Sequence, residues 1–305
     1  MKAKNVLLLI ILALCWGPSF FFIKIVLEEI PTFMLVNCRL GIAAIILIII
    51  VKCQGKKLFT WIHLWKQFLI MGVSACALPF VLITYSETMI ESSLAGIING
   101  SAPIFTAILA HYFLESEKMN VKKIVGISLG FLGIVAAFLP SLLEGQHANV
   151  LGIIYVMIAS ISYAIGMVYS RKYLMALPNL IGPTCQLIMG SLVLLPFTFI
   201  IDKPFSIPFP SMKILISLIS LAILGTVLAF VLYYAIAKKV GATYLSTSTL
   251  LFPFVSIFLG VIFLHETLHW NAYLGCFLIV LGLITANSLI NFKDILSLFK
   301  MKKMQ

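Results

Sequence analysis

Residues 113–138 read FLESEKMNVKKIVGISLGFLGIVAAF, and residues 263–287 read FLHETLHWNAYLGCFLIVLGLITAN. A shift of 149 positions superimposes one glutamate and two glycines of the two stretches, placing Glu117 on Glu266, Gly126 on Gly275 and Gly133 on Gly282. Similarity at a fixed offset indicates an internal duplication. The chain is therefore predicted to contain two copies of one unit.

The duplication extends toward the start of each copy. A shift of 150 carries Pro103 onto Pro253, and a shift of 147 carries Trp16 onto Tyr163, Lys24 onto Arg171 and Pro31 onto Pro178. Three shifts this close predict small loop insertions between the copies. The first repeat is predicted at residues 1–140, the second at 150–290, and a basic cytoplasmic tail at 291–305.

The composition places both copies in a membrane. Of 305 residues, 62% are hydrophobic and only 10% are charged, whereas about a quarter of a soluble domain is charged. The net charge of +11 does not indicate nucleic-acid binding, because the basic residues are scattered between apolar runs. The six cysteines also stand singly, with no CxxC pair, and are interpreted as small hydrophobic residues.

Ten apolar runs are long enough, or nearly so, to span a bilayer. They lie at about 6–27, 33–51, 65–86, 92–113, 121–139, 150–170, 180–200, 214–236, 242–264 and 270–290. With both termini in the cytoplasm, all but four of the 21 basic residues fall inside; Lys203 and Lys213 lie outside, and Lys24 and Arg39 within spans. This bias follows the positive-inside rule and supports the ten spans and their orientation.

Five spans in each copy mean that the second copy enters the membrane from the opposite side. The predicted fold is therefore an all-α polytopic membrane protein, with ten transmembrane helices arranged as two inverted five-helix repeats. Inverted repeats are typical of transporters, whose substrate site lies near the midplane between the repeats. Rocking of the two halves would then open this site to each side alternately.

The segment HETLH, residues 265–269, has the spacing of a zinc-protease helix. Its glutamate belongs to the repeated pattern, but the matching stretch of the first copy, ESEKM, contains no histidine. HETLH also falls at the predicted turn between the ninth and tenth spans, where a continuous helix would have to break. A zinc intramembrane hydrolase using His265, Glu266 and His269 remains an alternative, but the sequence predicts no enzyme and no metal site.

The repeat resembles the drug/metabolite transporter superfamily, in its EamA-type branch of ten-helix carriers. The resemblance covers about residues 5–290 and is carried by CWGPSFFFIK (residues 15–24), Pro31 and Arg39, by Pro103, Glu117, Gly126 and Gly133, and by Pro253, Glu266, Gly275 and Gly282. Pro18 departs from the pattern, because a small polar residue is more usual after Trp16-Gly17. This departure leaves the shape of the first helix open.

The resemblance implies a multi-pass carrier of small metabolites in the bacterial inner membrane, often one that exports amino acids or related compounds. An importer of a nucleoside-like or amino-acid-like substrate is the alternative. The expected partners are the small-molecule substrate and the lipid bilayer, with the protein acting as a monomer or homodimer. No cofactor and no nucleic acid are expected.

Arg39 is the first candidate for the substrate site. It lies about 10 Å below the outer surface, and its repeat partner is the neutral Gln186. A charge within a span is costly unless it is paired or faces water. Either it binds a substrate anion or acts in gating, or it extends past Asn37 toward Glu28 or Glu29. Lys24 and Arg171, near span ends, are expected to anchor their helices at the interfaces.

Further candidates come from equivalent positions of the two repeats. Trp16 and Tyr163 lie in mid-span, and Ser19 belongs to the motif that carries the resemblance; all three are predicted to bind substrate. Pro103 and Pro253 deprive the carbonyls of Asn99 and Thr249 of helical donors, and such carbonyls must find partners in hydrocarbon. These four residues are therefore predicted to weaken two helices at the substrate site. Tyr85 and Tyr234, another equivalent pair, are expected in an interfacial belt near span ends.

The acidic residues lie at span ends or in loops, so none is a convincing midplane proton carrier. Glu87 and Glu91, at the outer mouth, are the candidates for gating or proton coupling.

Overall fold

This computed structural model describes residues 3–115, 117–145, 147–174, 176–178, 180–236 and 251–286, which form helices joined by turns and loops and contain no β-strand. The first repeat contains α1 (Ala3–Trp16), α2 (Ser19–Val26), α3 (Thr32–Cys53), α4 (Trp65–Gly72), α5 (Leu78–Ser86), α6 (Ser92–Asn99), α7 (Ala102–Phe113) and α8 (Val121–Leu143). The second contains α9 (His147–Tyr173), α10 (Ile181–Phe197), α11 (Met212–Ala222), a helical segment at 229–236, α13 (Phe252–Phe263) and α14 (Trp270–Ala286).

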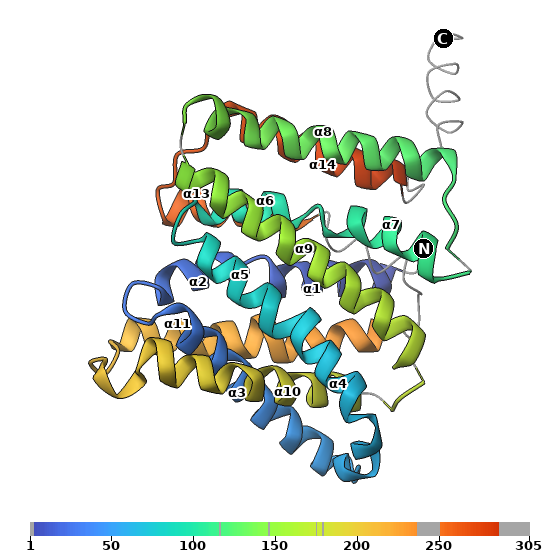
Figure 1. Ribbon diagram of the computed structural model, residues 1–305, viewed down its shortest axis with the longest axis vertical. Helices are drawn as coiled ribbons and strands as arrows, with labels where there is room; N and C mark the ends of the chain where they lie inside the picture. The colour runs from blue at the N-terminus through green and yellow to red at the C-terminus, as the bar shows by residue number, and fades with distance from the viewer. Residues whose placement is uncertain are drawn as a thin grey trace.

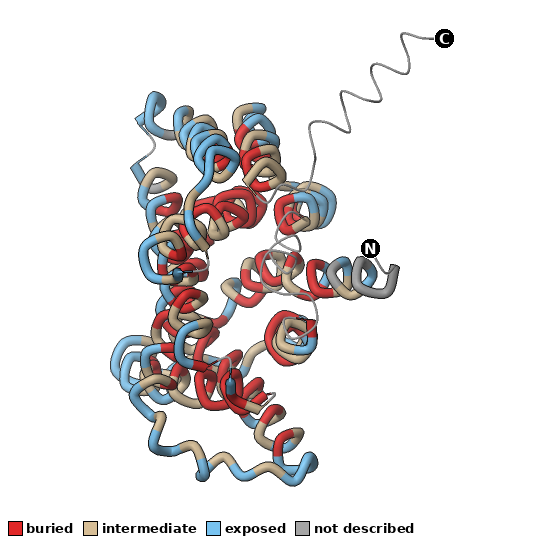
Figure 2. Tube along the Cα trace, turned by 90° about the vertical axis from the view of Figure 1, so that its right-hand side faces the viewer, coloured by how far each residue is buried: buried red, intermediate tan, exposed pale blue. Residues whose placement is uncertain are grey.

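These helices have the lengths and composition of membrane spans. Within the described ranges, seven helical stretches are long and apolar enough to cross a bilayer, and three further apolar helices are shorter. They follow the order of the ten predicted spans, although residues 242–250 of the ninth and the tail at 291–305 lie outside the described residues. Buried residues gather toward the interior while the outer helix faces are exposed (Figure 2). The chain is thus an all-α polytopic membrane protein.

The repeat glycines are explained by the contact between α8 and α14, which lie side by side at one edge of the molecule (Figure 1). A Cβ added to Gly126 would lie 2.4 Å from the carbonyl oxygen of Gly282, and one added to Gly133 would lie 2.7 Å from that of Gly275. Small residues allow such close backbone approach between membrane helices. Any larger side chain at these positions would force the two helices apart.

The same contacts show how the repeats are related. Gly126 and Gly275 are repeat partners, and so are Gly133 and Gly282. In the structure Gly126 contacts Gly282 and Gly133 contacts Gly275, so each glycine contacts a member of the other pair. This exchange is what a two-fold axis between two copies produces. The two helices also run antiparallel, because the earlier glycine of one meets the later glycine of the other. The inverted five-helix repeats predicted from the sequence are therefore formed.

Other equivalent spans also pair across the repeats: α3 packs on α10, and α6, in the fourth span, packs on α13, in the ninth. The contact of α4 with α9 has its counterpart in the contact of α11 with α2. The core is consequently built between the repeats as well as within them. The interface between the repeats is where the sequence predicts the substrate site.

Several spans are interrupted near the middle of the fold. The first breaks at Gly17-Pro18, between α1 and α2, and the fourth breaks at Gly100-Ser101, between α6 and α7. The third and eighth spans contain π-helical turns at Val73–Ala77 and Ile223–Leu228, which are equivalent under the shift of 150. Such turns alter the backbone hydrogen bonding and are frequent at functional sites.

Candidate substrate-binding site

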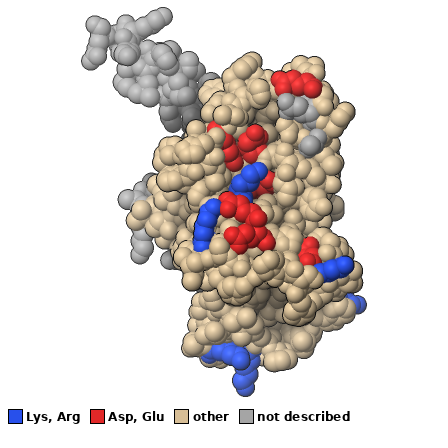
Figure 3. Space-filling view, turned by 90° about the vertical axis from the view of Figure 1, so that its left-hand side faces the viewer, with Lys and Arg blue, Asp and Glu red and all other residues tan. Residues whose placement is uncertain are grey.

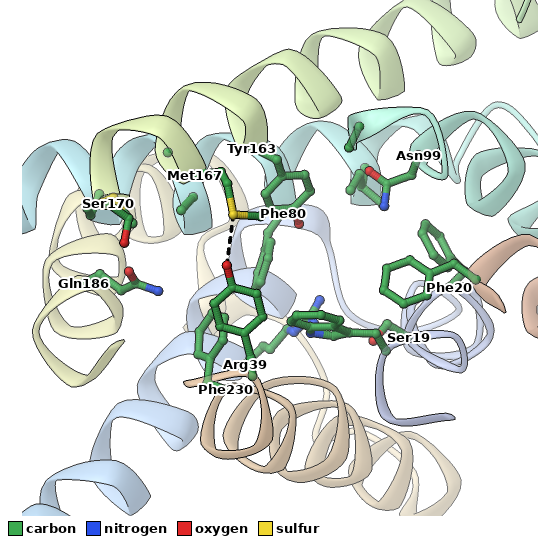
Figure 4. A pocket seen from close by; sticks show the side chains of 18 of the residues that line it. Ser19, Phe20, Arg39, Phe80, Asn99, Tyr163, Met167, Ser170, Gln186 and Phe230 are labelled. Carbon is green, nitrogen blue, oxygen red and sulfur yellow. Dashed lines mark hydrogen bonds between the residues drawn. The ribbon is translucent and has the colours of Figure 1, made fainter. Parts of the chain in front are cut away.

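A cavity of about 190 Å³ lies where these interrupted spans meet. Five of the predicted binding residues line it: Trp16, Ser19, Arg39, Asn99 and Tyr163. Figure 4 shows Asn99 and Ser19 at one side of the cavity and Ser170 and Gln186 at the other, with Arg39, Phe80 and Tyr163 between them. The lining is mostly apolar, with a few polar groups that converge from different helices, as is typical of small-molecule sites.

Arg39 is held in the cavity wall by the eighth span. Its Nε donates to Thr226 Oγ1 at 2.9 Å and its Nη2 donates to the Gly225 carbonyl at 3.2 Å. Both partners lie in the π-helical turn. The guanidinium carbon also lies 4.0 Å from the centre of the Phe80 ring, a cation–π contact. Arg39 is only 5% exposed, and its hydrogen-bond partners are neutral.

The alternative in which Arg39 extends toward the outer acids is wrong. Glu28 forms an exposed ion pair with Lys213, and Glu29 accepts a hydrogen bond from the Ser211 backbone N–H. That hydrogen bond lowers the pKa of Glu29. The sequence did not indicate that the π-helical turn of the eighth span supplies the hydrogen-bond partners of Arg39.

Aromatic rings build the apolar part of the wall. Trp16 packs against Tyr233 and Phe252, with ring centres 5.7 and 5.6 Å away, and Tyr163 packs against Phe80 at 6.2 Å. The Tyr233 hydroxyl donates to the Met167 sulfur, which fixes that ring beside the cavity. The repeat-equivalent pair Trp16 and Tyr163 thus reaches one cavity from two repeats.

The two prolines shape the backbone and do not line the cavity. Pro103 follows the break after Asn99, and Asn99 Oδ1 accepts a hydrogen bond from Ser160 at 3.4 Å. Pro253 lies in the first turn of α13, where its Cγ would be 2.9 Å from a Cβ added to Gly100. The two proline segments therefore meet, and the neighbours Ala102 and Phe252 contact the cavity. Thr249 lies outside the described residues.

Two polar groups at the cavity have no hydrogen-bond partner within the described part of the protein. They are Ser19 Oγ and Gln186 Oε1. Buried polar atoms are normally satisfied, so both are available to a bound solute. Gln186 interacts with Cys76, in the π-helical turn of the third span. Its repeat partner Arg39 interacts in the same way with the π-helical turn of the eighth span. That equivalence was the available signal for Gln186.

Sequence reasoning missed other lining residues, among them Met71, Phe80, Ser170 and Tyr233. Tyr234 was assigned to an interfacial belt, and this is wrong because it lines the cavity. Its repeat partner Tyr85 is 43% exposed and packs on Tyr155. The two tyrosines occupy equivalent positions in the sequence, but the surroundings of the two helices differ.

The two gating candidates differ in burial. Glu87 directly follows α5 and is 1% exposed, and neither carboxyl oxygen has a hydrogen-bond partner among the described residues. Burial raises the pKa of the Glu87 carboxyl well above its usual range. The positive charges of Lys24 and Arg39 oppose this increase in pKa, and the negative charge of Glu266 adds to it. Glu91 is half-buried and directly precedes α6.

HETLH does not form the helix that a zinc protease requires. α13 ends at Phe263 and α14 begins at Trp270, so the segment is a connection, and His265 has a left-handed φ of 56°. Glu266 accepts hydrogen bonds from Ser92 and Ser93. Among the described residues, no group of three or more histidine, cysteine or acidic residues could hold a metal. The motif is part of the repeated scaffold.

The expectation that Lys24 and Arg171 serve as interfacial anchors also needs correction. Lys24 donates to the carbonyls of Glu87 and Ile90. Arg171 forms an ion pair with Glu117. Both cations are thus used inside the protein, to hold loops at opposite ends of the cavity.

Comparison with known proteins agrees with this architecture. A family model described as "EamA-like transporter family" matches the chain twice, at residues 3–139 and 150–288. The chain is 28% identical to "Uncharacterized transporter YoaV" of Bacillus subtilis, across 92% of this chain and 95% of that protein. It is 26% identical to "Uncharacterized inner membrane transporter YedA" of Escherichia coli K12, across 90% and 87%. A solved crystal structure shares the fold, with a TM-score of 0.68, 16% identity and coverage of 95% of this chain and 98% of that one.

Proposed function

The chain belongs to the EamA-like transporter family, and from that premise we propose that it exports amino acids or related small metabolites across the bacterial inner membrane. The inner-membrane location is supported by the similarity to YedA. The site is the central cavity, and the transport cycle is alternating access between the two inverted repeats. The observation that carries the proposal is a buried cation, Arg39, in the wall of a mostly apolar cavity between the repeats.

The chemistry of the cavity favours a substrate with a carboxylate. A buried guanidinium with neutral hydrogen-bond partners offers an anion a strong, charge-assisted interaction. The unsatisfied Ser19 and Gln186 can bind further polar atoms. An amino group would contact the faces of Trp16 and Tyr163 by cation–π attraction, because the described residues that line the cavity include no acid.

A substrate screen in reconstituted vesicles tests the proposal. Purified protein is placed in vesicles loaded with an amino-acid mixture, and efflux is followed with and without a proton gradient. Loss of specific amino acids from the vesicles is the expected result. Uptake of a nucleoside-like or amino-acid-like solute, driven only in the opposite direction, would favour the importer alternative. Loss of uncharged solutes with no preference for carboxylates would contradict the proposed role of Arg39.

Glu87 is proposed as the coupling residue. Its carboxyl is buried, lies within the electrostatic influence of Lys24, Glu266 and Arg39, and has no hydrogen-bond partner among the described residues. Because burial raises its pKa, Glu87 keeps its proton to higher pH than an ordinary carboxyl, and deprotonation as pH rises places a negative charge in the protein. Glu87→Gln copies the protonated form. We expect this variant to transport with no dependence on the proton gradient, whereas Glu91→Gln tests the half-buried candidate.

Both termini are proposed to face the cytoplasm. Single cysteines at Gln305 and Glu144 are treated with an impermeant thiol reagent in intact cells. The residue at 144 should react, and the one at 305 should be protected. The opposite pattern would reverse the orientation without affecting the inverted repeats.

A further inference from the structure

Two glutamates lie at opposite ends of the cavity, and each binds residues of the other repeat. They are Glu117, in the loop between α7 and α8, and Glu266, in the loop between α13 and α14. The shift of 149 makes them equivalent. Their equivalence suggests that both loops perform one task at the two ends of the carrier.

At one end, Glu117 of the first repeat forms an ion pair with Arg171 of the second. Arg171 lies in the last turn of α9, directly after Ser170, which lines the cavity. The side chains of the pair are partly shielded from solvent, so the interaction is less screened than a surface pair. The contact ties the end of α9 to the loop of the first repeat.

At the other end, Glu266 of the second repeat binds the first turn of α6. Its Oε1 accepts a hydrogen bond from Ser92 N at 2.8 Å, and its Oε2 accepts from Ser93 N at 3.0 Å and from the Ser93 hydroxyl. A carboxylate at a helix N-terminus also interacts favourably with the helix dipole. Figure 3 looks onto this end and shows acidic and basic side chains gathered at its centre.

Lys24 reinforces the closure at the same end. Its ammonium donates to the Glu87 carbonyl at 2.6 Å and to the Ile90 carbonyl at 3.0 Å. The loop from Glu87 to α6 is therefore held from both sides, by Lys24 and by Glu266. Two residues that line the cavity lie close to this contact in the sequence. Ile23 directly precedes Lys24, and Ile83 lies one helical turn before Glu87. The cavity thus lies between the Glu117–Arg171 pair at one end and the contacts of Glu266 and Lys24 at the other.

We propose that the Glu117–Arg171 pair and the Glu266–α6 contact are the two clasps of the carrier, which open in turn and expose the cavity to opposite faces of the membrane. This inference rests on the proposed alternating-access function. Both clasps are closed in the structure. A carrier must keep one end closed whenever the other is open, and two equivalent contacts across the repeat interface meet that requirement.

The test measures access to the cavity from each face. A single cysteine is placed at Ala102, a lining residue, after the six native cysteines are replaced. The protein is reconstituted in vesicles, and an impermeant thiol reagent is added to one side or the other. We expect Glu117→Gln to raise the labelling rate about tenfold from one face and Glu266→Gln to raise it about tenfold from the opposite face.

A matched control and a rescue keep the test independent of misfolding. Glu28→Gln breaks the exposed pair with Lys213 and should leave labelling from both faces unchanged. The double variant Glu117→Arg with Arg171→Glu restores an ion pair and should return labelling to the parent rate. Unchanged labelling in both single variants, an increase at the same face in both, or failure of the rescue in a folded protein would overturn the proposal.

The labelling experiment needs no substrate, so its outcome can be separated from the substrate proposal. Normal clasps with no amino-acid transport would refute the proposed substrate alone. Amino-acid transport with unchanged labelling would refute the clasps alone.

Discussion

Replacing Arg39 by Gln should remove the preference of the cavity for a carboxylate. The substitution deletes the positive charge but keeps a side chain able to hydrogen-bond to Thr226 Oγ1. Because the hydrogen-bond partners of Arg39 are neutral, the change leaves no carboxylate directly deprived of its partner. Loss of one member of a buried ion pair is strongly destabilising, but that situation does not arise here. The variant is therefore expected to fold.

The expected effect on binding follows from the strength of a charge-assisted hydrogen bond. Such a bond contributes about 1.5–3 kcal/mol when the partner is charged, which corresponds to about a ten- to hundredfold change in the dissociation constant. The effect on unfolding should be smaller, within about 1 kcal/mol, because the lost hydrogen bonds are offset by removal of a desolvated charge. Affinity should thus fall while thermal stability stays nearly constant.

The assay measures the affinity of the purified protein for an amino acid and for its amide, in which a neutral carboxamide replaces the carboxylate. The parent protein should bind the acid more tightly than the amide, and Arg39→Gln should bind both equally. Arg39→Lys keeps the charge but loses the planar fork of donors, so it should retain part of the preference. Lys213→Gln is the charge-matched control. It removes an exposed cation that is not among the lining residues, so it should not alter the ratio of the affinities for the acid and the amide.

A folded Arg39→Gln variant that still prefers the acid over the amide to the same extent as the parent would refute the role of Arg39 in binding the carboxylate. In that case the anion would be bound elsewhere and Arg39 would serve only to hold the eighth span.

Three further outcomes are expected. Replacing His265 and His269 together by Ala should preserve most transport activity, and a zinc chelator should not change it, because HETLH is a loop; loss of transport restored by zinc would contradict this. Asn99→Ala should weaken substrate affinity about fivefold, as expected for one lost neutral hydrogen bond, and an unchanged affinity would place the substrate away from the α6 break. Gly133→Ala should destabilise the protein by about 1–3 kcal/mol because its Cβ would collide with α14; Gly41→Ala, whose Cβ has only an ordinary contact, is the control in the same thermal unfolding measurement.

Much of the fold was predictable because a bilayer imposes simple requirements. Span length follows from membrane thickness, and inversion follows from an odd number of spans in each copy. The glycines at 126, 133, 275 and 282 marked the repeat, and the structure shows their physical reason in the α8–α14 contact. The weakening of the helix before Pro103 also follows from the missing N–H of proline.

The site was less predictable because its geometry depends on contacts between helices. Sequence depth suggested that Arg39 could reach Glu28 or Glu29, whereas its partners come from a π-helical turn that no local pattern announced. Glu87 was placed at an outer mouth, but its carboxyl is almost fully buried by neighbouring elements. Position along a helix gives the depth of a residue in the membrane, whereas the face it presents and the distortion of its neighbours depend on tertiary packing.

The departures from repeat symmetry are as informative as the symmetry itself. A two-fold scaffold gives the two membrane faces equivalent closures, but a small asymmetric substrate cannot bind equally to two identical halves. Arg39 and Gln186 occupy equivalent positions, and each interacts with a π-helical turn of the other repeat, yet only Arg39 is charged. Under the proposed function, the charge of Arg39 would define one orientation for a bound anion, and the shared backbone pattern would serve the alternating-access motion. In this proposal, recognition would depend on positions where the repeats differ, and alternating access on positions where they agree.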